Sequence, residues 1–225
     1  MLDNRFRRKD KHFLSYILRF PVKDEKTDEK TSQMFDCLGK YAYTSQCQTN
    51  MIMKLILATQ NDFDAIIAFY DDVTERTPGM ATYARWSKGK HPTEEGIRAY
   101  IDEGSMYVYQ EGGEIIAAVA LTMYQGEDYH AIQWSRQVAD DEVAVIHILA
   151  VSPDRQGTGI GSEMIRDAIR LAQSRGMKAI RLDALASNTP AHKLYERLGF
   201  EYRGTQHLYA ENTGWMDFLF FEFRQ

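Results

Sequence analysis

The chain has 225 residues, of which 44% are hydrophobic and 12% are aromatic, and its formal net charge at pH 7 is -5. This length fits one domain, with or without an appendage, and this composition supports a packed core rather than a disordered chain. The negative charge gives no electrostatic attraction for nucleic acid, so we expect no such partner. Two cysteines are too few for a disulfide framework, and no Cys or His pair has zinc-type spacing, so we predict no metal.

Residues 1–52 differ from the rest of the chain, because a charged run at 23–30 has no sustained periodicity around it. Met51 and Met53 directly precede an apolar run, so this stretch is either an over-extended reading frame or a loosely structured arm. We predict an N-terminal extension over 1–52 and one domain over 53–225. Since no apolar run approaches the roughly 20 residues of a membrane span, we expect no membrane partner and a cytoplasmic location.

From residue 53 onward, the spacing of apolar residues and the turn residues between them predict a series of strands and helices. The first half is expected to hold a strand at 54–58, a helix capped by Asn61 or Asp62, a helix from about 92 to 103, strands at 106–110 and 115–124, and a strand continuing over 129–136.

The second half begins with a continuous apolar run at 143–151, which is typical of a central strand covered on both faces. A helix at 159–175, a strand at 179–185, a helix at 189–198 and a hairpin of strands at 200–208 and 215–223 follow it. This order predicts an α/β (α+β) domain, in which helices flank a mixed, mostly antiparallel sheet with one strand–helix–strand unit near its centre.

The most informative segment is 151–161, VSPDRQGTGIG, a glycine-rich turn between the buried strand and an amphipathic helix. The first amides of a helix have no partner within it, and glycines let a ligand approach the backbone, so this turn predicts a phosphate or diphosphate site. A Walker loop needs a lysine before Ser162, and a dinucleotide motif needs different glycine spacing after an early strand. A dinucleotide site and a purely structural turn stay open as alternatives.

The spacing resembles the main motif of the GNAT acetyltransferase superfamily, Gln/Arg-x-x-Gly-x-Gly/Ala, at Gln156-x-x-Gly159-x-Gly161. The resemblance extends to the preceding strand at 148–153 and to the later segment at 188–200, NTPAHKLYERLGF, and it covers the chain from residue 53 onward. It implies a twisted sheet with splayed central strands and the pantetheine arm of CoA in the gap between them. It also implies acetyl transfer from acetyl-CoA, as co-substrate, to a primary amine.

The same resemblance implies roles for individual residues. Main-chain groups of Leu149 and Val151 would pair with the pantetheine amides, and Asn188 would touch that arm. Tyr195 would donate a proton to the departing CoA thiolate, unless it is only a core aromatic residue beside the apolar stripe of Ala191, Leu194 and Leu198. The diphosphate would lie on Arg155, Gln156, Gly157, Thr158, Gly159, Ile160, Gly161 and Ser162.

The base that deprotonates the amine is less clearly marked in the sequence. Strict alternation along the central strand places His147 on the face of Leu149 and Val151, where it is either a catalytic base or a hydrogen-bonded core histidine. Asp141 and Glu142 are alternative bases or parts of a solvated turn. Four aromatic residues are candidates for an acceptor pocket or for the core: Tyr83, Trp86, Tyr124 and Trp134.

We therefore predict an acetyl-CoA-dependent N-acetyltransferase that acts by direct attack and a tetrahedral intermediate, with a small-molecule or peptide amine as acceptor. One alternative is a catalytically inactive CoA-binding module that regulates a partner. Another is a nucleotide-dependent enzyme that uses the glycine turn for ATP or NAD. The aromatic residues of the closing strand also suggest a homodimer.

Overall fold

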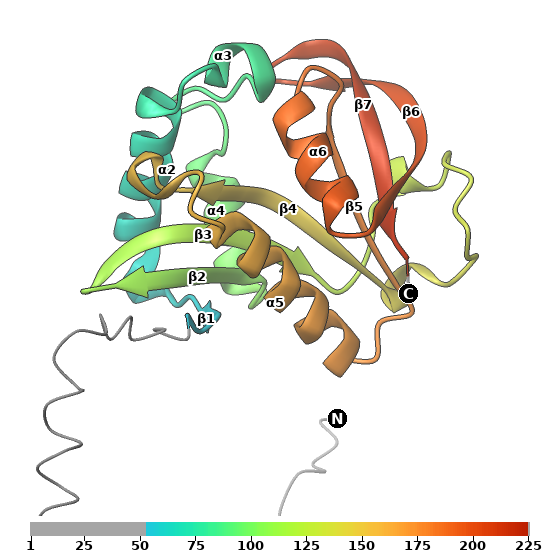
Figure 1. Cartoon of the computed structure of the whole chain (residues 1–225), viewed down its shortest axis with the longest axis horizontal. Coiled ribbons are helices and arrows are strands. Elements are labelled where there is room, and N and C mark those ends of the chain that lie inside the picture. Colours follow the sequence, from blue (N-terminus) through green and yellow to red (C-terminus); the bar gives the residue numbers. More distant parts are fainter. Residues whose placement is uncertain (1–52, 225) are drawn as a thin grey trace, which may run out of the picture. The chain divides into compact units, whose positions relative to one another are not determined.

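The computed structural model describes residues 53–224, which form one seven-stranded sheet with helices packed on it (Figure 1). The strand order is β1-β2-β3-β4-β5-β7-β6, and only β4 and β5 run parallel to each other among these neighbours. The predicted fold class, a mixed and mostly antiparallel sheet flanked by helices, is confirmed. The predicted extension at 1–52 lies outside the described residues.

The elements agree closely with the expected ones. The first half contains β1 (Ile56–Leu57), α2 (Phe63–Arg76), α3 (Met80–Tyr83), α4 (Glu94–Asp102), β2 (Met106–Glu111) and β3 (Glu114–Thr122). The second half contains β4 (Val143–Val151), α5 (Ile160–Ser174), β5 (Ala179–Leu185), α6 (Thr189–Arg197), β6 (Phe200–Ala210) and β7 (Gly214–Phe223). None of the helices between residues 53 and 224 is long and apolar enough to cross a membrane.

The strand expected at 129–136 is wrong. This part of the chain is irregular, with a short 3-10 turn at Glu127–Tyr129. The backbone amides of Tyr129 and Trp134 donate to nearby carbonyls of Gly126 and Ile132, so they are not available to a neighbouring strand. The apolar residues that suggested a strand instead pack as a small cluster against Phe220 of β7.

Local hydrogen bonds explain where two helices begin. Thr93 Oγ1 accepts from the Gly96 amide at 3.0 Å at the start of α4, and Asn188 Oδ1 accepts from the Ala191 amide at 3.4 Å at the start of α6. Asp62 precedes α2 as expected, but its carboxylate accepts from the Thr59 amide at 2.8 Å and does not cap the helix. Asp62 thus holds the predicted N-cap position, but its side chain makes no capping hydrogen bond to α2.

The sheet carries separate hydrophobic clusters on its two faces. Helix α5 buries Met164 and Ile165 on one face, together with Ile146 of β4. Helices α2 and α4 bury Ile66 and Ile97 on the opposite face. Strand β4 contributes side chains to both clusters, which confirms that it is a central strand covered on both faces.

The sheet opens between β4 and β5. These strands are in register only from Val143–Ile146 to Ala179–Leu182, although both continue beyond that contact. Figure 1 shows the two strands diverging. The splayed central strands that the resemblance implied are therefore present.

Candidate active site

A β-bulge interrupts β4 at the point where it leaves β5. His147 is in register with Ala120 and Ala150 with Ala118, so Ile148 and Leu149 together stand opposite one residue of β3. Ile148 has a φ of 43°, which is uncommon for a β-branched residue. This bulge reverses the alternation of side chains along the second half of the strand.

The reversed alternation changes the position of His147. Leu149 packs with the α5 cluster, whereas the His147 ring stacks on Tyr100 of α4, with 5.8 Å between ring centroids. The prediction that His147 shares the face of Leu149 and Val151 is therefore wrong. The imidazole lies on the α4 face of the sheet.

Helix α2 holds the bulge in place. The Tyr70 hydroxyl donates to the Ile148 carbonyl at 2.7 Å, and the Tyr70 side chain is buried. Burial also raises the pKa of Tyr70, so the hydroxyl remains a donor at neutral pH. No pattern in the sequence connects these two residues, which lie on different elements.

A cavity of about 610 Å³ lies beside the glycine turn, α6 and the segment at 77–86. It is lined by every predicted cofactor residue except Thr158, namely Leu149, Val151, Arg155, Gln156, Gly157, Gly159, Ile160, Gly161, Ser162 and Asn188. The Thr158 hydroxyl instead donates to the Arg155 carbonyl at 2.6 Å, within the turn itself. Neither β3 nor β5 has a residue in register with Leu149.

The glycine turn has the backbone that its sequence requires. Gly157 and Gly159 have φ values of 78° and 93°, in the region that side-chain-bearing residues rarely adopt. A Cβ on Gly161 would meet Val151 Cγ2 at 3.3 Å, so the glycine permits α5 to approach β4 closely. Gln156 Nε2 donates to Thr77 Oγ1 at 2.9 Å and joins the turn to the end of α2.

The charges around this cavity favour an anionic ligand. Arg155 and Arg197 both line it, and no aspartate or glutamate is among its described lining residues. Arg155 also forms an ion pair with Glu111. Arg197 is not part of the family motif or of the apolar stripe of α6, so it was not predicted as a site residue. A basic residue in the last turn of that helix was the available signal.

Tyr195 lies where this cavity meets a second one. Its ring is only 8% exposed and packs against Phe200 and Phe221, with centroids 6.1 and 5.8 Å away. Burial, with a smaller effect from Asp183, raises its pKa, so this phenol is protonated at neutral pH and able to donate a proton.

The second cavity has a volume of about 230 Å³ and lies on the α4 side of the opening between β4 and β5. Its lining includes Tyr100, His147 and Asp183. The two cavities share Trp86, Leu149, Asn188 and Tyr195 among their lining residues. They therefore meet at the part of the sheet where the strands separate.

His147 is a neutral imidazole in this setting. Burial lowers its pKa to about 4. The Thr122 hydroxyl donates to the Tyr124 carbonyl at 2.8 Å, so it accepts from His147 Nε2, which lies 3.3 Å away. This tautomer leaves the lone pair on His147 Nδ1 available to a proton.

The other predicted site residues are divided between the cavities and the rest of the fold. Tyr83 lines the larger cavity and Trp86 lines both. Asp141 and Glu142 lie before the start of β4, at the opposite end from the bulge, and Glu142 forms an ion pair with Lys178. Neither acid lines either cavity, and the same holds for Tyr124 and Trp134.

Comparison with known proteins agrees with this geometry. The model of the acetyltransferase (GNAT) family matches residues 66–200, which is more than half of the chain. The chain belongs to the acetyltransferase (GNAT) family. The resemblance stated from the sequence motifs is thus confirmed.

Individual relatives share the GNAT fold or sequence over most of the domain. An uncharacterized N-acetyltransferase of Methanocaldococcus jannaschii is 34% identical over 149 residues, which cover 64% of this chain and 58% of that relative. A GNAT acetyltransferase of Streptococcus agalactiae has a TM-score of 0.62 at 20% identity, covering 78% of this chain and 96% of that one. A Salmonella typhimurium acetyltransferase solved with acetyl-CoA has a TM-score of 0.56 at 17% identity. The match covers 76% of this chain and 93% of that one.

Proposed function

We propose that this protein is an N-acetyltransferase that transfers the acetyl group of acetyl-CoA directly to a primary amine. The observation that carries this proposal is the meeting of two cavities at Tyr195. The larger one has basic residues and a glycine turn, and the smaller one contains an acid and a neutral imidazole. Each substrate therefore has a cavity of its own, and the reacting atoms meet where the strands separate.

The larger cavity suits acetyl-CoA. Arg155, Arg197 and the first amides of α5 would bind phosphate oxygens, and the space beside Leu149 and Val151 would hold the pantetheine arm. The family membership and the acetyl-CoA in the Salmonella structure both support this assignment.

Transfer begins when the amine nitrogen attacks the thioester carbonyl carbon. A C–N bond forms, and the carbonyl π electrons move to the oxygen, where the Leu149 amide would stabilise the negative charge. The intermediate then collapses and the C–S bond breaks. The departing thiolate takes the proton of the Tyr195 hydroxyl, the nitrogen gives its surplus proton to His147 Nδ1 and then to solvent, and the Tyr195 phenolate takes a proton back from solvent. From a neutral amine the products are the acetylated amine and CoA with its thiol, and an amine that enters as an ammonium releases one proton in all.

Replacement of Tyr195 tests this assignment. Tyr195→Phe retains the buried ring but removes the hydroxyl, so we expect kcat to fall about 10²-fold, as for loss of a general acid. Calorimetric titration should give a dissociation constant for acetyl-CoA within ~2-fold of the wild-type value, because the ring only borders the CoA cavity.

Three results would count against the proposal. Unchanged turnover in Tyr195→Phe removes the role of Tyr195 as proton donor. Binding of acetyl-CoA without CoA release in the presence of an amine library favours the inactive CoA-binding module. Binding of ATP or NAD in place of acetyl-CoA favours a nucleotide-dependent enzyme.

A further inference from the structure

The charged residues that line the smaller cavity are of one sign. Asp183 is the one acidic residue among its described lining residues, and no lysine or arginine lines it. Aromatic rings of Trp86, Tyr100 and Phe218 form part of the wall. Burial lowers the pKa values of His91 and His147, which also line this cavity, so both rings are neutral at pH 7.

Asp183 projects from β5 beyond the point where this strand leaves β4. Its Oδ1 accepts from the Tyr129 hydroxyl at 2.5 Å, and this is its only side-chain hydrogen bond within the part of the chain that the structure describes. The carboxylate therefore has capacity to accept further hydrogen bonds from a ligand. Burial raises the pKa of Asp183, and a bound cation would favour the ionised form.

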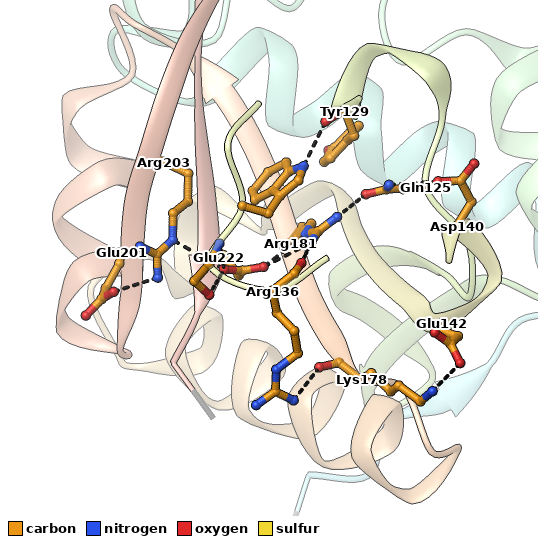
Figure 2. A network of polar contacts seen from close by, with 12 residues as sticks. Gln125, Tyr129, Arg136, Asp140, Glu142, Lys178, Arg181, Glu201, Arg203 and Glu222 are labelled. Atoms are coloured by element: carbon orange, nitrogen blue, oxygen red, sulfur yellow. Dashed lines mark hydrogen bonds and ion pairs between the residues drawn. The ribbon is translucent and has the colours of Figure 1, made fainter. Parts of the chain in front are cut away.

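A buried network of polar contacts fixes the loop that carries Tyr129 (Figure 2). Arg181, on the same strand, donates to Glu222, to the Gln125 side chain and to the Arg136 carbonyl. Its guanidinium lies 4.0 Å from the centre of the Trp134 ring, and the Trp134 indole donates to the Tyr129 carbonyl at 2.7 Å. The network holds Tyr129 in place, and Tyr129 holds Asp183.

We propose that Asp183 binds the ammonium group of the acceptor and restricts it to small primary monoamines with an aromatic or apolar body. The inference rests on the proposed acetyl transfer and deepens it by naming the substrate class. The ammonium would donate hydrogen bonds to Asp183 and to His147 Nδ1, and it would lose one proton to solvent before the neutral amine attacks. The aromatic wall would contact the rest of the molecule.

The same charges disfavour other amines. The carboxylate of an amino acid would enter a cavity that has Asp183 and no basic lining residue. A second ammonium on a polyamine would have no second acid to pair with among the described residues that line the cavity, and burying an unpaired charge is costly. Selectivity therefore depends on the charge of Asp183 rather than on the shape of the cavity alone.

The test uses the full chain and a matched pair of amines, phenethylamine and phenylalanine, which share a skeleton and differ by one carboxylate. Further arylalkyl and alkyl monoamines and 1,4-diaminobutane complete the panel. We expect kcat/KM for the best monoamine to exceed that for phenylalanine and for the diamine by at least ~30-fold. Titration of the amines into the CoA-bound protein supplies a readout independent of turnover.

Asp183→Asn removes the charge but keeps an oxygen that accepts from Tyr129. We expect kcat/KM for the monoamine to fall at least ~30-fold, mainly through KM, and its preference over phenylalanine to shrink. Asp217→Asn is the matched control, because Asp217 is also on a strand but is exposed and lines neither cavity. It should behave as wild type. Tyr129→Phe should lose less activity than Asp183→Asn.

The outcomes separate this inference from the proposed function. If acetyl-CoA binds but no amine releases CoA, the proposed function fails. If amines are acetylated but phenylalanine or the diamine is preferred, the role of Asp183 is overturned. The same holds if Asp183→Asn and Asp217→Asn have equal kcat/KM for the monoamine. If Asp183→Asn weakens acetyl-CoA binding and all amines equally and lowers the unfolding temperature, Asp183 is structural and the inference is also overturned.

Discussion

At the scale of single residues, burial shifts the pKa values of two groups at the candidate site further from neutral pH. It raises the pKa of the Tyr195 phenol, which is protonated at pH 7, and lowers the pKa of the His147 imidazole, which is neutral at pH 7. These two states suit a proton donor to sulfur and an acceptor of a proton from nitrogen. The type of each residue was visible in the sequence, but its pKa depends on the surrounding fold.

His147 should make the stability of the fold depend on pH. Its pKa is about 4 in the folded protein and near 6.5 in an unfolded chain, so the unfolded state binds a proton first as pH falls. We expect the free energy of unfolding to decrease between about pH 6.5 and pH 4, by up to ~3 kcal/mol from this residue. Urea unfolding at pH 7 and pH 4.5 measures the decrease.

His147→Gln is the comparison for this measurement, because the glutamine amide can still donate to Thr122 but does not titrate in this range. The variant should lose less stability than the wild type on acidification. It should also turn over more slowly at pH 7 if His147 accepts the proton of the amine. Equal pH dependence in the two proteins would show that another group is responsible.

At the scale of elements, the bulge in β4 links a contact in the core to the position of the reacting groups. Tyr70→Phe removes the hydrogen bond to the Ile148 carbonyl and leaves a buried acceptor without its donor. We expect a loss of roughly 1–2 kcal/mol in the free energy of unfolding and a lower kcat, because Leu149 lies in the same bulge. Urea unfolding and steady-state kinetics check the two effects.

Tyr109→Phe is a matched control on another part of the sheet. The Tyr109 hydroxyl donates to Asp167 of α5 at 2.5 Å, and Tyr109 lines neither cavity. This variant should lose stability while its turnover per folded molecule stays near the wild-type value. A similar fall in kcat in both variants would mean that general loosening, and not the bulge, lowers the rate.

Elements that are determined by a short stretch of sequence could be predicted from that sequence. The apolar run of β4 and the strand β5 have the bounds that the sequence indicated, and the glycine turn follows from a short motif. The bulge was not predictable, because it depends on a hydrogen bond to a distant helix. The strand expected at 129–136 was wrong because burial against Phe220 produces the same apolar pattern as a strand would.

The smaller cavity was also beyond sequence analysis, for a related reason. Its lining comes from α4, α6, β4, β5, the end of β6, β7 and the segments between elements, which no single motif connects. Asp183 was not predicted as a site residue, since nothing local shows that Tyr129 and His147 lie near it. The proposed cofactor site follows largely from one continuous motif, but the proposed acceptor site requires the fold.

At the scale of the whole molecule, the sheet and both cavities are built from residues 53–224. We therefore predict that a chain beginning at Met53 folds and binds acetyl-CoA with a dissociation constant within ~3-fold of the full chain, a difference of about 0.7 kcal/mol. Calorimetric titration of both proteins measures it. Binding that requires the full chain would assign residues 1–52 a part in the fold or the site.

The short parallel contact between β4 and β5 has a consequence for local opening of the sheet. Main-chain pairing between the β1–β4 part and the β5–β7 part consists of the register from Val143–Ile146 to Ala179–Leu182. A ligand in the CoA cavity would touch Leu149 on one side and Asn188 on the other, and so would an acceptor in the smaller cavity. Ligands should therefore act as cross-links, and amide hydrogen exchange at Ile146 and Leu182 should slow most when both cavities are filled.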